Sequence, residues 1–486
     1  EKPRVLLLGA AGGFRAPEAL RLGAASITVI EPEPVLRNAL RQGLGPSPAM
    51  APDPRIELSS AHPLNATGRY DLIDVAGDFL GADDANRHTY TAEAMAGWIA
   101  QLNPGGMISI PISIRELPVY AVRLLATAQA ALIKAGMPDP GAHLVVIRSA
   151  WNLRVLIARD GFRPESVAKL QHFTEARSFD ISHAPGLGPE GREIWNDLPA
   201  VSLDSGFVQS GSAADAVAEE ARLLLAGQAP LDAFDRSAVT ADRPWLSPLV
   251  RLSALPQALE RVEILPQQEI GLLVNVAVLA QAILLALLVS ALPLFARGAL
   301  RVPRSILGRA LIYFPALGLG FLLIEIAFIE YAVLLLGDRT SAFALVLTVM
   351  LVCSGLGAMV AGQLARPGLA LKWAVLIAAL SCVVTILVAH QAILAVLDWP
   401  WAMRAALLVL AIAPASLALG FPFPLGLDRF QQEGPALLPW AWALNGAFSV
   451  VATPLANLVG HGLGLTALLL GGLACYLSTV IVWPRN

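Results

Sequence analysis

The chain has 486 residues, of which 56% are hydrophobic and only 15% are charged, and its formal net charge is −3. Soluble globular proteins carry about a quarter charged residues, so this composition excludes a protein that is soluble throughout. The charge is also unevenly distributed, because residues 1–269 hold 31 acidic and 24 basic side chains, whereas residues 270–486 hold 6 and 10. The sequence therefore predicts a soluble half followed by a membrane half. Neither half has the basic excess of a nucleic-acid-binding protein.

Cysteines, histidines and the first residue narrow the function classes further. Cys353, Cys382 and Cys475 all lie in apolar runs of the second half, which predicts buried side chains rather than a disulfide framework. The histidines of the first half show no metal-ligand spacing, so no metal site is predicted. The chain starts at Glu1 without a signal peptide, and we expect that a preceding segment was removed or is encoded separately.

The first thirty residues predict the opening βαβ unit of a nucleotide-binding sheet. Residues 4–8 are typical of a strand, a glycine turn follows at 9–13, a helix is expected at 17–22, and a second strand at 26–30 ends in Glu31. Glycines let the backbone approach a ligand, and an acid after the second strand can accept the hydrogen bonds of a ribose. A turn that binds nothing is the alternative. The candidate cofactor-binding residues are Gly9, Ala11, Gly12, Gly13 and Glu31.

The alternation of strands and helices continues along the first half. The predicted elements are strands at 55–58, 70–75 and 107–112, helices at 92–102 and 118–135, a turn at 103–106, and a closing antiparallel pair at 143–148 and 154–158. This pattern gives a mostly parallel sheet with helices on both faces. Ligands of such sheets bind beyond the carboxyl ends of the strands. We therefore expect the glycine turn, Glu31 and Asp78 to lie at one edge.

Several stretches carry a resemblance to a known family. VLLLGAAGG, ITVIEPEP, YDLIDVAGD and YTAEAMAGWIAQLNPGGMISI resemble spermidine synthases and their class I S-adenosylmethionine-dependent relatives. The chain is also similar to a membrane-fused branch of that family through VTADRPWL (239–246), FLLIEIAFIEYAVLLLG (321–337), LGFPFPLGL (419–427) and PWAWALNGAFSV (439–450). The resemblance covers most of the chain. It implies a Rossmann-like transferase domain that binds S-adenosylmethionine or its decarboxylated form, joined to a polytopic membrane domain.

The sequence departs from the family pattern at the positions that carry its chemistry. The middle of the glycine turn is Ala11, and the Asp that usually follows the turn is replaced around Phe14-Arg15. The Asp-Gly expected near the adenine reads Ser-Ala-His at 60–62, and the β-hairpin that precedes the first strand in spermidine synthases is missing from this chain. The catalytic Asp falls near Ala76, which leaves Asp78 as the candidate catalytic residue. Aminopropyl transfer needs a carboxylate to accept the amine proton, so we predict a degenerate domain that binds a nucleotide weakly or not at all.

The second half contains seven apolar stretches long enough to cross a bilayer. They lie near 270–295, 310–336, 341–364, 370–389, 404–427, 437–459 and 463–483, with an amphipathic piece expected at 391–403. The predicted domains are a Rossmann domain at 1–226, a connector at 227–269 and an all-α transmembrane domain at 270–486.

Loop charges predict an orientation in the membrane. The loops after the first, third, fifth and seventh stretches carry eight basic residues, and the opposite side carries three. The positive-inside rule then places the former loops in the cytoplasm and residues 1–269 on the exocytoplasmic face, periplasmic in a bacterial inner membrane. Adenosyl cofactors are made in the cytoplasm, which agrees with an eroded cofactor site.

Two carboxylates lie within the second apolar stretch. Glu325 and Glu330 are five residues apart and so lie on different faces of a helix. A carboxylate inside a bilayer is costly unless it is neutral or paired. We expect a neutral Glu325 that donates a hydrogen bond to a neighbouring helix, with Asn445 as a candidate partner. A proton or cation pathway is the alternative.

Three functions follow from these observations. The leading hypothesis is a membrane protein with a degenerate spermidine synthase-like domain that serves assembly or binds other membrane or periplasmic subunits. The second is an active aminopropyl or methyl transferase, and the third is a transporter with a sensor domain. The side of the membrane on which residues 1–269 lie discriminates between them, because a cytoplasmic domain favours an enzyme.

Overall fold

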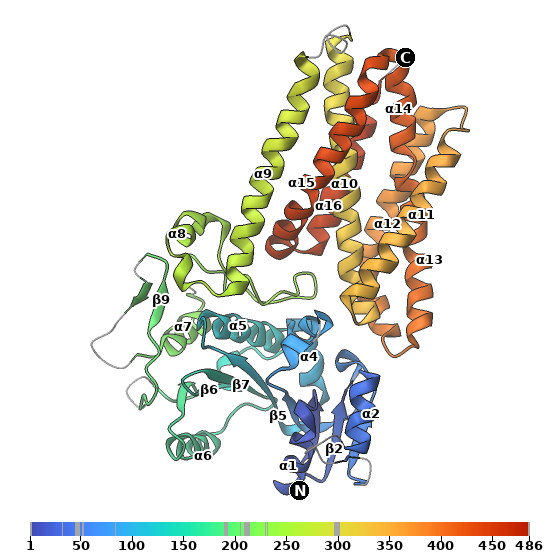
Figure 1. Ribbon diagram of the computed structural model, residues 1–486. Helices are drawn as coiled ribbons and strands as arrows, with labels where there is room; N and C mark the ends of the chain where they lie inside the picture. Colours follow the sequence, from blue (N-terminus) through green and yellow to red (C-terminus); the bar gives the residue numbers. More distant parts are fainter. Residues whose placement is uncertain are drawn as a thin grey trace. The chain divides into compact units, whose positions relative to one another are not determined.

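A computed structural model gives the fold of the chain, which forms two compact units, Glu1–Gly271 and Leu272–Asn486 (Figure 1). The segment 227–269, expected as a connector, is counted within the first unit. The structure describes residues 2–31, 33–43, 49–50, 53–82, 84–188, 193–204, 206–208, 214–228, 230, 232–295 and 302–484.

The first unit is built on an eight-stranded sheet with the order β3-β2-β1-β4-β5-β7-β6-β8. Strands β1 to β5 are parallel, whereas β7 and β6 continue the sheet in antiparallel pairing. This is a Rossmann-like fold, as expected from the sequence, and the predicted closing antiparallel pair is present as β6 and β7. The strands are β1 Arg4–Leu8, β2 Ser26–Ile30, β3 Ile56–Ser59, β4 Tyr70–Val75, β5 Leu102–Ser113, β6 Leu144–Arg148, β7 Asn152–Ala158 and β8 Asp180–His183.

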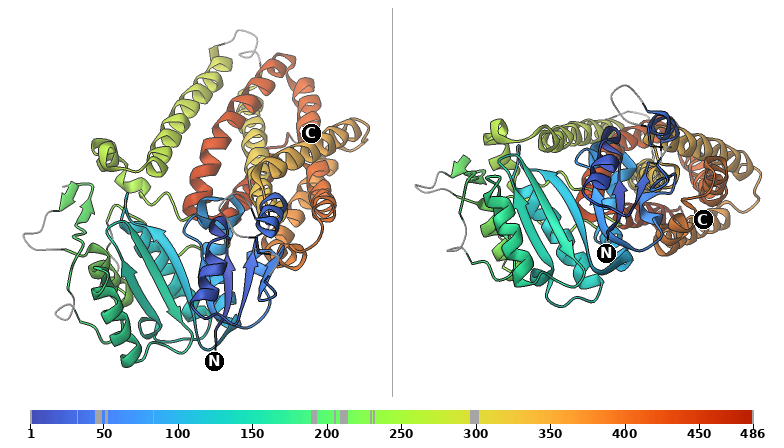
Figure 2. Two further views of the ribbon diagram at one scale, coloured as in Figure 1. Left: turned by 60° about the horizontal axis from the view of Figure 1, so that its bottom comes forward. Right: turned by 90° about the horizontal axis from the view of Figure 1, so that it is seen from below.

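Helices cover both faces of this sheet (Figure 2), which explains why β1 is apolar at almost every position. Val5 and Leu7 pack into one cluster with residues of α1, and Leu6 and Leu8 pack into a larger cluster on the other face with α4 and α5. A short hairpin, β9 Ala200–Ser202 and β10 Gly206–Val208, lies outside the sheet. The helices are α1 Arg15–Arg21, α2 Pro34–Gln42, α3 Phe79–Ala82, α4 Ala92–Gln101, α5 Val119–Lys134, α6 Pro164–Glu175, α7 Ala216–Leu225 and α8 Leu255–Glu260.

One expected turn is wrong. Residues 103–106 belong to β5, whose register against β4 shifts between Tyr70 and Leu72. The Asn-Pro-Gly-Gly sequence favours a turn by composition, but here it forms an irregularity within the strand. A Cβ on Gly106 would meet the carbonyl oxygens of Asn103 at 2.9 Å and Tyr70 at 3.0 Å, so close backbone approach requires glycine there.

The second unit consists of long apolar helices. Six helical segments of the described chain are long and apolar enough to cross a membrane, and Leu465–Ile481 is a shorter apolar helix. The expected count of seven spans therefore holds only if this shorter helix also crosses. The helices are α9 Gln267–Phe295, which begins in the first unit, α10 Arg304–Leu336, α11 Arg339–Ala361, α12 Pro367–Val396, α13 Trp401–Leu419, α14 Pro422–Glu433, α15 Leu438–Leu463 and α16 Leu465–Ile481.

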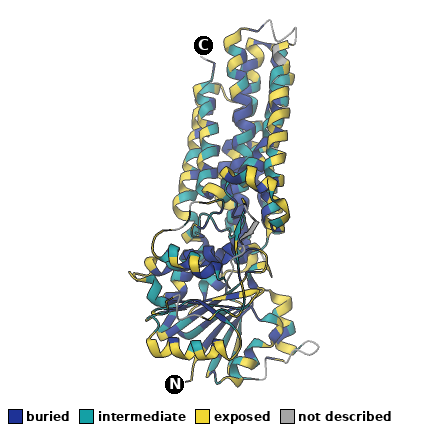
Figure 3. Cartoon of the chain, turned by 90° about the vertical axis from the view of Figure 1, so that its left-hand side faces the viewer, coloured by how far each residue is buried: buried dark blue, intermediate teal, exposed yellow. Residues whose placement is uncertain are grey.

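The fourth span is longer than expected. Helix α12 continues to Val396, so the predicted amphipathic piece at 391–403 is divided between the end of α12, a short turn and the start of α13. Helix α10 is the most buried candidate span and packs against α15, α16 and α11. The other spans have exposed residues along their lengths (Figure 3), and many of these residues are large and apolar. Such exposure is expected of helices that face lipid.

Candidate functional site

The glycine turn between β1 and α1 has a backbone that glycine favours. Gly9, Gly12 and Gly13 have φ values of 81°, 68° and 89°. A Cβ on Gly9 would lie 3.0 Å from a ring carbon of Phe79 and 3.1 Å from the Cβ of Ala76. Ala11 also lies in the left-handed region, at φ 45°, where an L side chain is unfavourable. The turn after β1 therefore has four residues in the left-handed region, three of them glycines.

Glu31 follows β2 and is buried, with 8% of its surface exposed. Its Oε1 accepts a hydrogen bond from the backbone N–H of Glu33 at 3.2 Å, and its carbonyl oxygen accepts one from Arg37 at 2.7 Å. Burial raises the pKa of the Glu31 carboxyl, and the charges of Glu33 and Asp78 raise it further. One oxygen of the side chain therefore already accepts a hydrogen bond from the backbone of the following loop.

Asp78, the candidate catalytic residue, lies just after β4 and is exposed. Its charge acts on both Glu31 and Tyr90, which places the three groups at the same edge of the sheet. Burial raises the pKa of the Tyr90 hydroxyl, and the Asp78 charge adds to this. The structure therefore brings the glycine turn, Glu31 and Asp78 to the carboxyl edge of the parallel strands, where the sequence predicts them.

A cluster at the turn was missed by the sequence reasoning. Arg15, in the first turn of α1, forms an ion pair with Asp74 of β4 and donates to the carbonyl oxygen of Gly9 at 3.3 Å. Arg154 of β7 donates to the other oxygen of Asp74 at 2.8 Å and to the Oγ of Ser109 at 2.6 Å. The signal was present in the sequence, since Asp74 is an acid within an apolar strand and Arg15 follows the glycine turn.

This cluster occupies both oxygens of the Asp74 carboxylate, so Asp74 is not available to a cationic ligand. The methionine-derived tail of S-adenosylmethionine carries a cationic sulfonium, an ammonium group and a carboxylate, whereas its decarboxylated form keeps the two cations and lacks the carboxylate. Asp74 is a carboxylate at the turn, but two guanidinium groups are already bound to it. Like charges at short range repel most strongly where water is partly excluded. The two guanidinium groups therefore disfavour a sulfonium or ammonium group beside Asp74, whereas a carboxylate could bind there.

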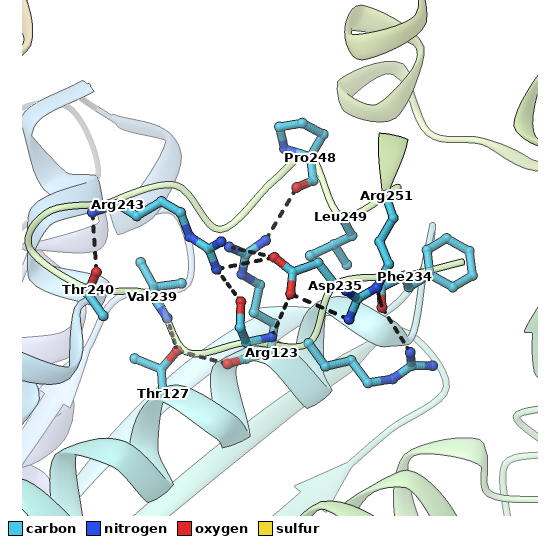
Figure 4. Close-up of polar contacts among 12 residues, drawn as sticks. Arg123, Thr127, Phe234, Asp235, Val239, Thr240, Arg243, Pro248, Leu249 and Arg251 are labelled. Atoms are coloured by element: carbon cyan, nitrogen blue, oxygen red, sulfur yellow. Dashed lines mark hydrogen bonds and ion pairs between the residues drawn. The ribbon is translucent and has the colours of Figure 1, made fainter. Parts of the chain in front are cut away.

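A second polar network ties the segment after residue 231 to α5 (Figure 4). Asp235 is surrounded by three arginines, with the nearest N–O distances 3.2 Å to Arg243, 3.8 Å to Arg123 and 3.9 Å to Arg251. Burial lowers the pKa of the Arg123 guanidinium to about 10, against the opposing effect of Asp235. Thr127 accepts from the backbone N–H of Val239 at 3.0 Å.

Glu269 extends this anchoring to the first turn of α9. The side chain has no exposed surface and accepts hydrogen bonds from the Tyr120 hydroxyl at 2.9 Å and from two backbone N–H groups. The N–H of Leu249 lies 2.9 and 2.8 Å from the two carboxylate oxygens, and the N–H of Val250 lies 3.0 Å from one of them. Burial and the Glu269 carboxylate raise the pKa of the Tyr120 hydroxyl. The segment 232–269 is therefore held by buried polar contacts, whereas the sequence suggests only a proline-containing linker.

Within the second unit, the two glutamates of α10 lie in different surroundings. Glu330 forms a two-point ion pair with Arg339, with distances of 3.0 and 3.4 Å. Glu325 is 7% exposed, and no hydrogen bond from it to Asn445 or to another described residue is present. Asn445 lines a cavity of about 280 Å³ to which six helices contribute residues. The expected hydrogen bond between Glu325 and Asn445 is thus wrong for the described part of the chain.

Comparisons with known proteins add the following. No family model matches the chain, and no curated protein matches it significantly. Among solved structures, a probable spermidine synthase from Corynebacterium glutamicum shares 18% identity over 36% of this chain and 62% of its own, with a TM-score of 0.29. Spermidine synthase from Thermotoga maritima shares 18% sequence identity over 35% of this chain and 59% of its own length, with a TM-score of 0.26. Human methyltransferase-like protein 13 in complex with S-adenosylhomocysteine shares 16% sequence identity over 36% of this chain and 82% of its own length, with a TM-score of 0.27. The chain spans about three fifths of the length of the two synthases.

Proposed function

We propose that the chain is an integral membrane protein whose Rossmann-like unit has lost cofactor binding and serves as a docking unit in a membrane complex. The observation that carries this proposal is the Arg15–Asp74–Arg154 cluster beside the glycine turn. In this cluster Arg15 and Arg154 bind the Asp74 carboxylate, which would otherwise be available to the cationic groups of a cofactor. The alternative transferase function retains one supporting observation, the placement of Glu31 and Asp78 at the same edge.

Apolar side chains at the same edge support docking of a protein. Phe14, directly after the glycine turn, is 52% exposed. Val35 and Leu36, in the first turn of α2 after Glu31, are 77% and 41% exposed. Exposed large apolar side chains that gather at one site are typical of interaction surfaces, and buried apolar anchors contribute most of the binding energy there. We therefore place the partner at the edge where a cofactor would otherwise bind.

Calorimetry on the full chain in detergent micelles tests the loss of cofactor binding. We expect no heat signal with S-adenosylmethionine, its decarboxylated form or S-adenosylhomocysteine at ligand concentrations of a hundred micromolar or more. Submicromolar binding that Glu31→Ala abolishes would overturn the proposal and restore the transferase alternative. Circular dichroism of both proteins controls for folding.

Photo-crosslinking in cells tests the docking surface. A photoreactive amino acid at Val35 should form a discrete adduct with a second polypeptide. Leu22 is the matched control, since it is 80% exposed but follows the end of α1, away from the turn. Equal adducts from both positions, or none from Val35, contradict a partner at this edge.

A reporter fusion tests the proposed exocytoplasmic position of the first unit. If α16 crosses the membrane as a seventh span, the two ends of the chain lie on opposite sides. Alkaline phosphatase fused after Asn486 is then inactive, because its fusion point lies in the cytoplasm. Arg297, Arg301 and Arg485, which contribute to the charge count, lie outside the described residues. An active phosphatase contradicts the assignment of seven spans with the first unit outside.

A further inference from the structure

A groove in the second unit runs between the first turns of α12 and the end of α13. It has a volume of about 570 Å³, within the range of about 300–1,000 Å³ typical of ligand sites. The lining residues are apolar except for Arg366, which is charged. The groove thus combines one cation with an extended apolar surface.

The groove has a floor of small residues and walls of large ones. Ala374 and Ala418 are buried, at 4% and 3% exposure, and form part of the lining. Leu369, Trp373 and Ile377, four residues apart along α12, are 47%, 57% and 44% exposed. This spacing places them on one stripe of the helix, about 12 Å long at 1.5 Å per residue. An extended hydrocarbon chain can lie along such a stripe.

The cation lies at one end of this stripe. Arg366 directly precedes Pro367, the first residue of α12, and its side chain is exposed. Its guanidinium has no hydrogen-bond or ion-pair partner in the part of the chain that the structure describes. Trp373 in the groove wall is typical of a side chain at the boundary between lipid headgroups and hydrocarbon. A negative group bound to Arg366 would therefore lie at headgroup depth.

From these contacts we infer that the groove binds an anionic phospholipid, with the phosphate on Arg366 and an acyl chain along α12. Basic residues beside grooves between membrane helices recognise anionic headgroups, and each contributes about 1 kcal/mol. The inference rests on the proposed function in one respect only, namely that the chain is inserted in a membrane. It is independent of whether the first unit binds a cofactor or a partner.

Native mass spectrometry of the full chain, released from detergent micelles, tests the site with two probes of equal chain length. Phosphatidylglycerol should be retained in preference to phosphatidylcholine. Arg366→Gln should reduce that preference about fivefold, the factor that corresponds to about 1 kcal/mol. Lys372→Gln is the matched control, because Lys372 is exposed in the same part of α12 but does not line the groove, and it should leave the preference unchanged.

A second variant tests the acyl chain. Ala370 is half-buried and lines the groove, so Ala370→Leu should fill it and reduce retention of both lipids. Soluble glycerol 3-phosphate, which has the phosphate but no chain, should not compete. Equal losses in the Arg366 and Lys372 variants, or unaltered preference in Arg366→Gln, would overturn the inference. Competition by glycerol 3-phosphate would also overturn it, in favour of a free phosphate site. Extraction of the chain by alkaline carbonate would instead refute membrane insertion itself.

Discussion

Replacement of Glu269 by alanine should release the segment that leads into the first membrane helix. The carboxylate is fully buried and accepts from the Tyr120 hydroxyl and from the backbone N–H groups of Leu249 and Val250. Without it, three buried donors lose their acceptor. Each such loss costs about 1–3 kcal/mol. The free energy needed to open this segment locally should therefore fall by at least about 3 kcal/mol. Since 1.4 kcal/mol corresponds to a factor of ten, amide exchange at 249 and 250 should become at least about 100-fold faster.

Hydrogen exchange measured by mass spectrometry on the full chain in detergent reports this directly, because it follows local opening rather than global unfolding. Tyr120→Phe removes one donor together with its need for an acceptor, and should increase exchange by less than Glu269→Ala. Glu260→Ala is the control, since Glu260 is exposed at the end of α8. If exchange of the peptide containing 249 and 250 changes by less than about threefold in Glu269→Ala, the segment is not held by this carboxylate.

Two other substitutions probe the first unit. Ala11→Gly should leave stability unchanged or raise it by up to about 1 kcal/mol, because relief of the left-handed backbone is offset by the greater chain entropy of glycine; a loss above about 1 kcal/mol in denaturant unfolding contradicts the conformation. Arg148→Met should lower the free energy of unfolding of the unit by about 3–5 kcal/mol. Arg148 is fully buried and lies 3.0 Å from both Asp180 and Asp215, so its loss leaves two buried acids without a cation. Arg163→Met, at an exposed position, should change unfolding by less than about 0.5 kcal/mol.

Local sequence patterns were sufficient to predict the parallel part of the sheet. In β1 and β4 the apolar runs are bounded by glycine or acidic residues, and both strands have the expected bounds. The turn at 103–106 failed because its glycines serve close backbone approach inside a strand, which composition does not distinguish from a turn.

Polar contacts between distant segments were not predictable from the sequence. Arg15 and Asp74 are 59 residues apart, and Arg154 is 80 residues from Asp74, so no local pattern joins them. Glu269 and Tyr120 are separated by 149 residues. The sequence did predict which side chains lie at the carboxyl edge, since strand ends follow from the apolar runs. It did not predict that arginines would bind the carboxylate at the turn.

The expected role of Glu325 is the prediction that the structure revises most. If Glu325 had a structural role through a hydrogen bond to another span, Glu325→Leu would reduce assembly, whereas Glu325→Gln would not. In the described part of the chain the carboxyl group has no such partner, so leucine removes a polar group from apolar surroundings without breaking a bond. We therefore expect Glu325→Leu to retain expression and a monodisperse peak in detergent gel filtration, as Glu325→Gln should. If leucine but not glutamine abolishes assembly, Glu325 has a hydrogen-bond partner outside this chain, and the expectation is wrong.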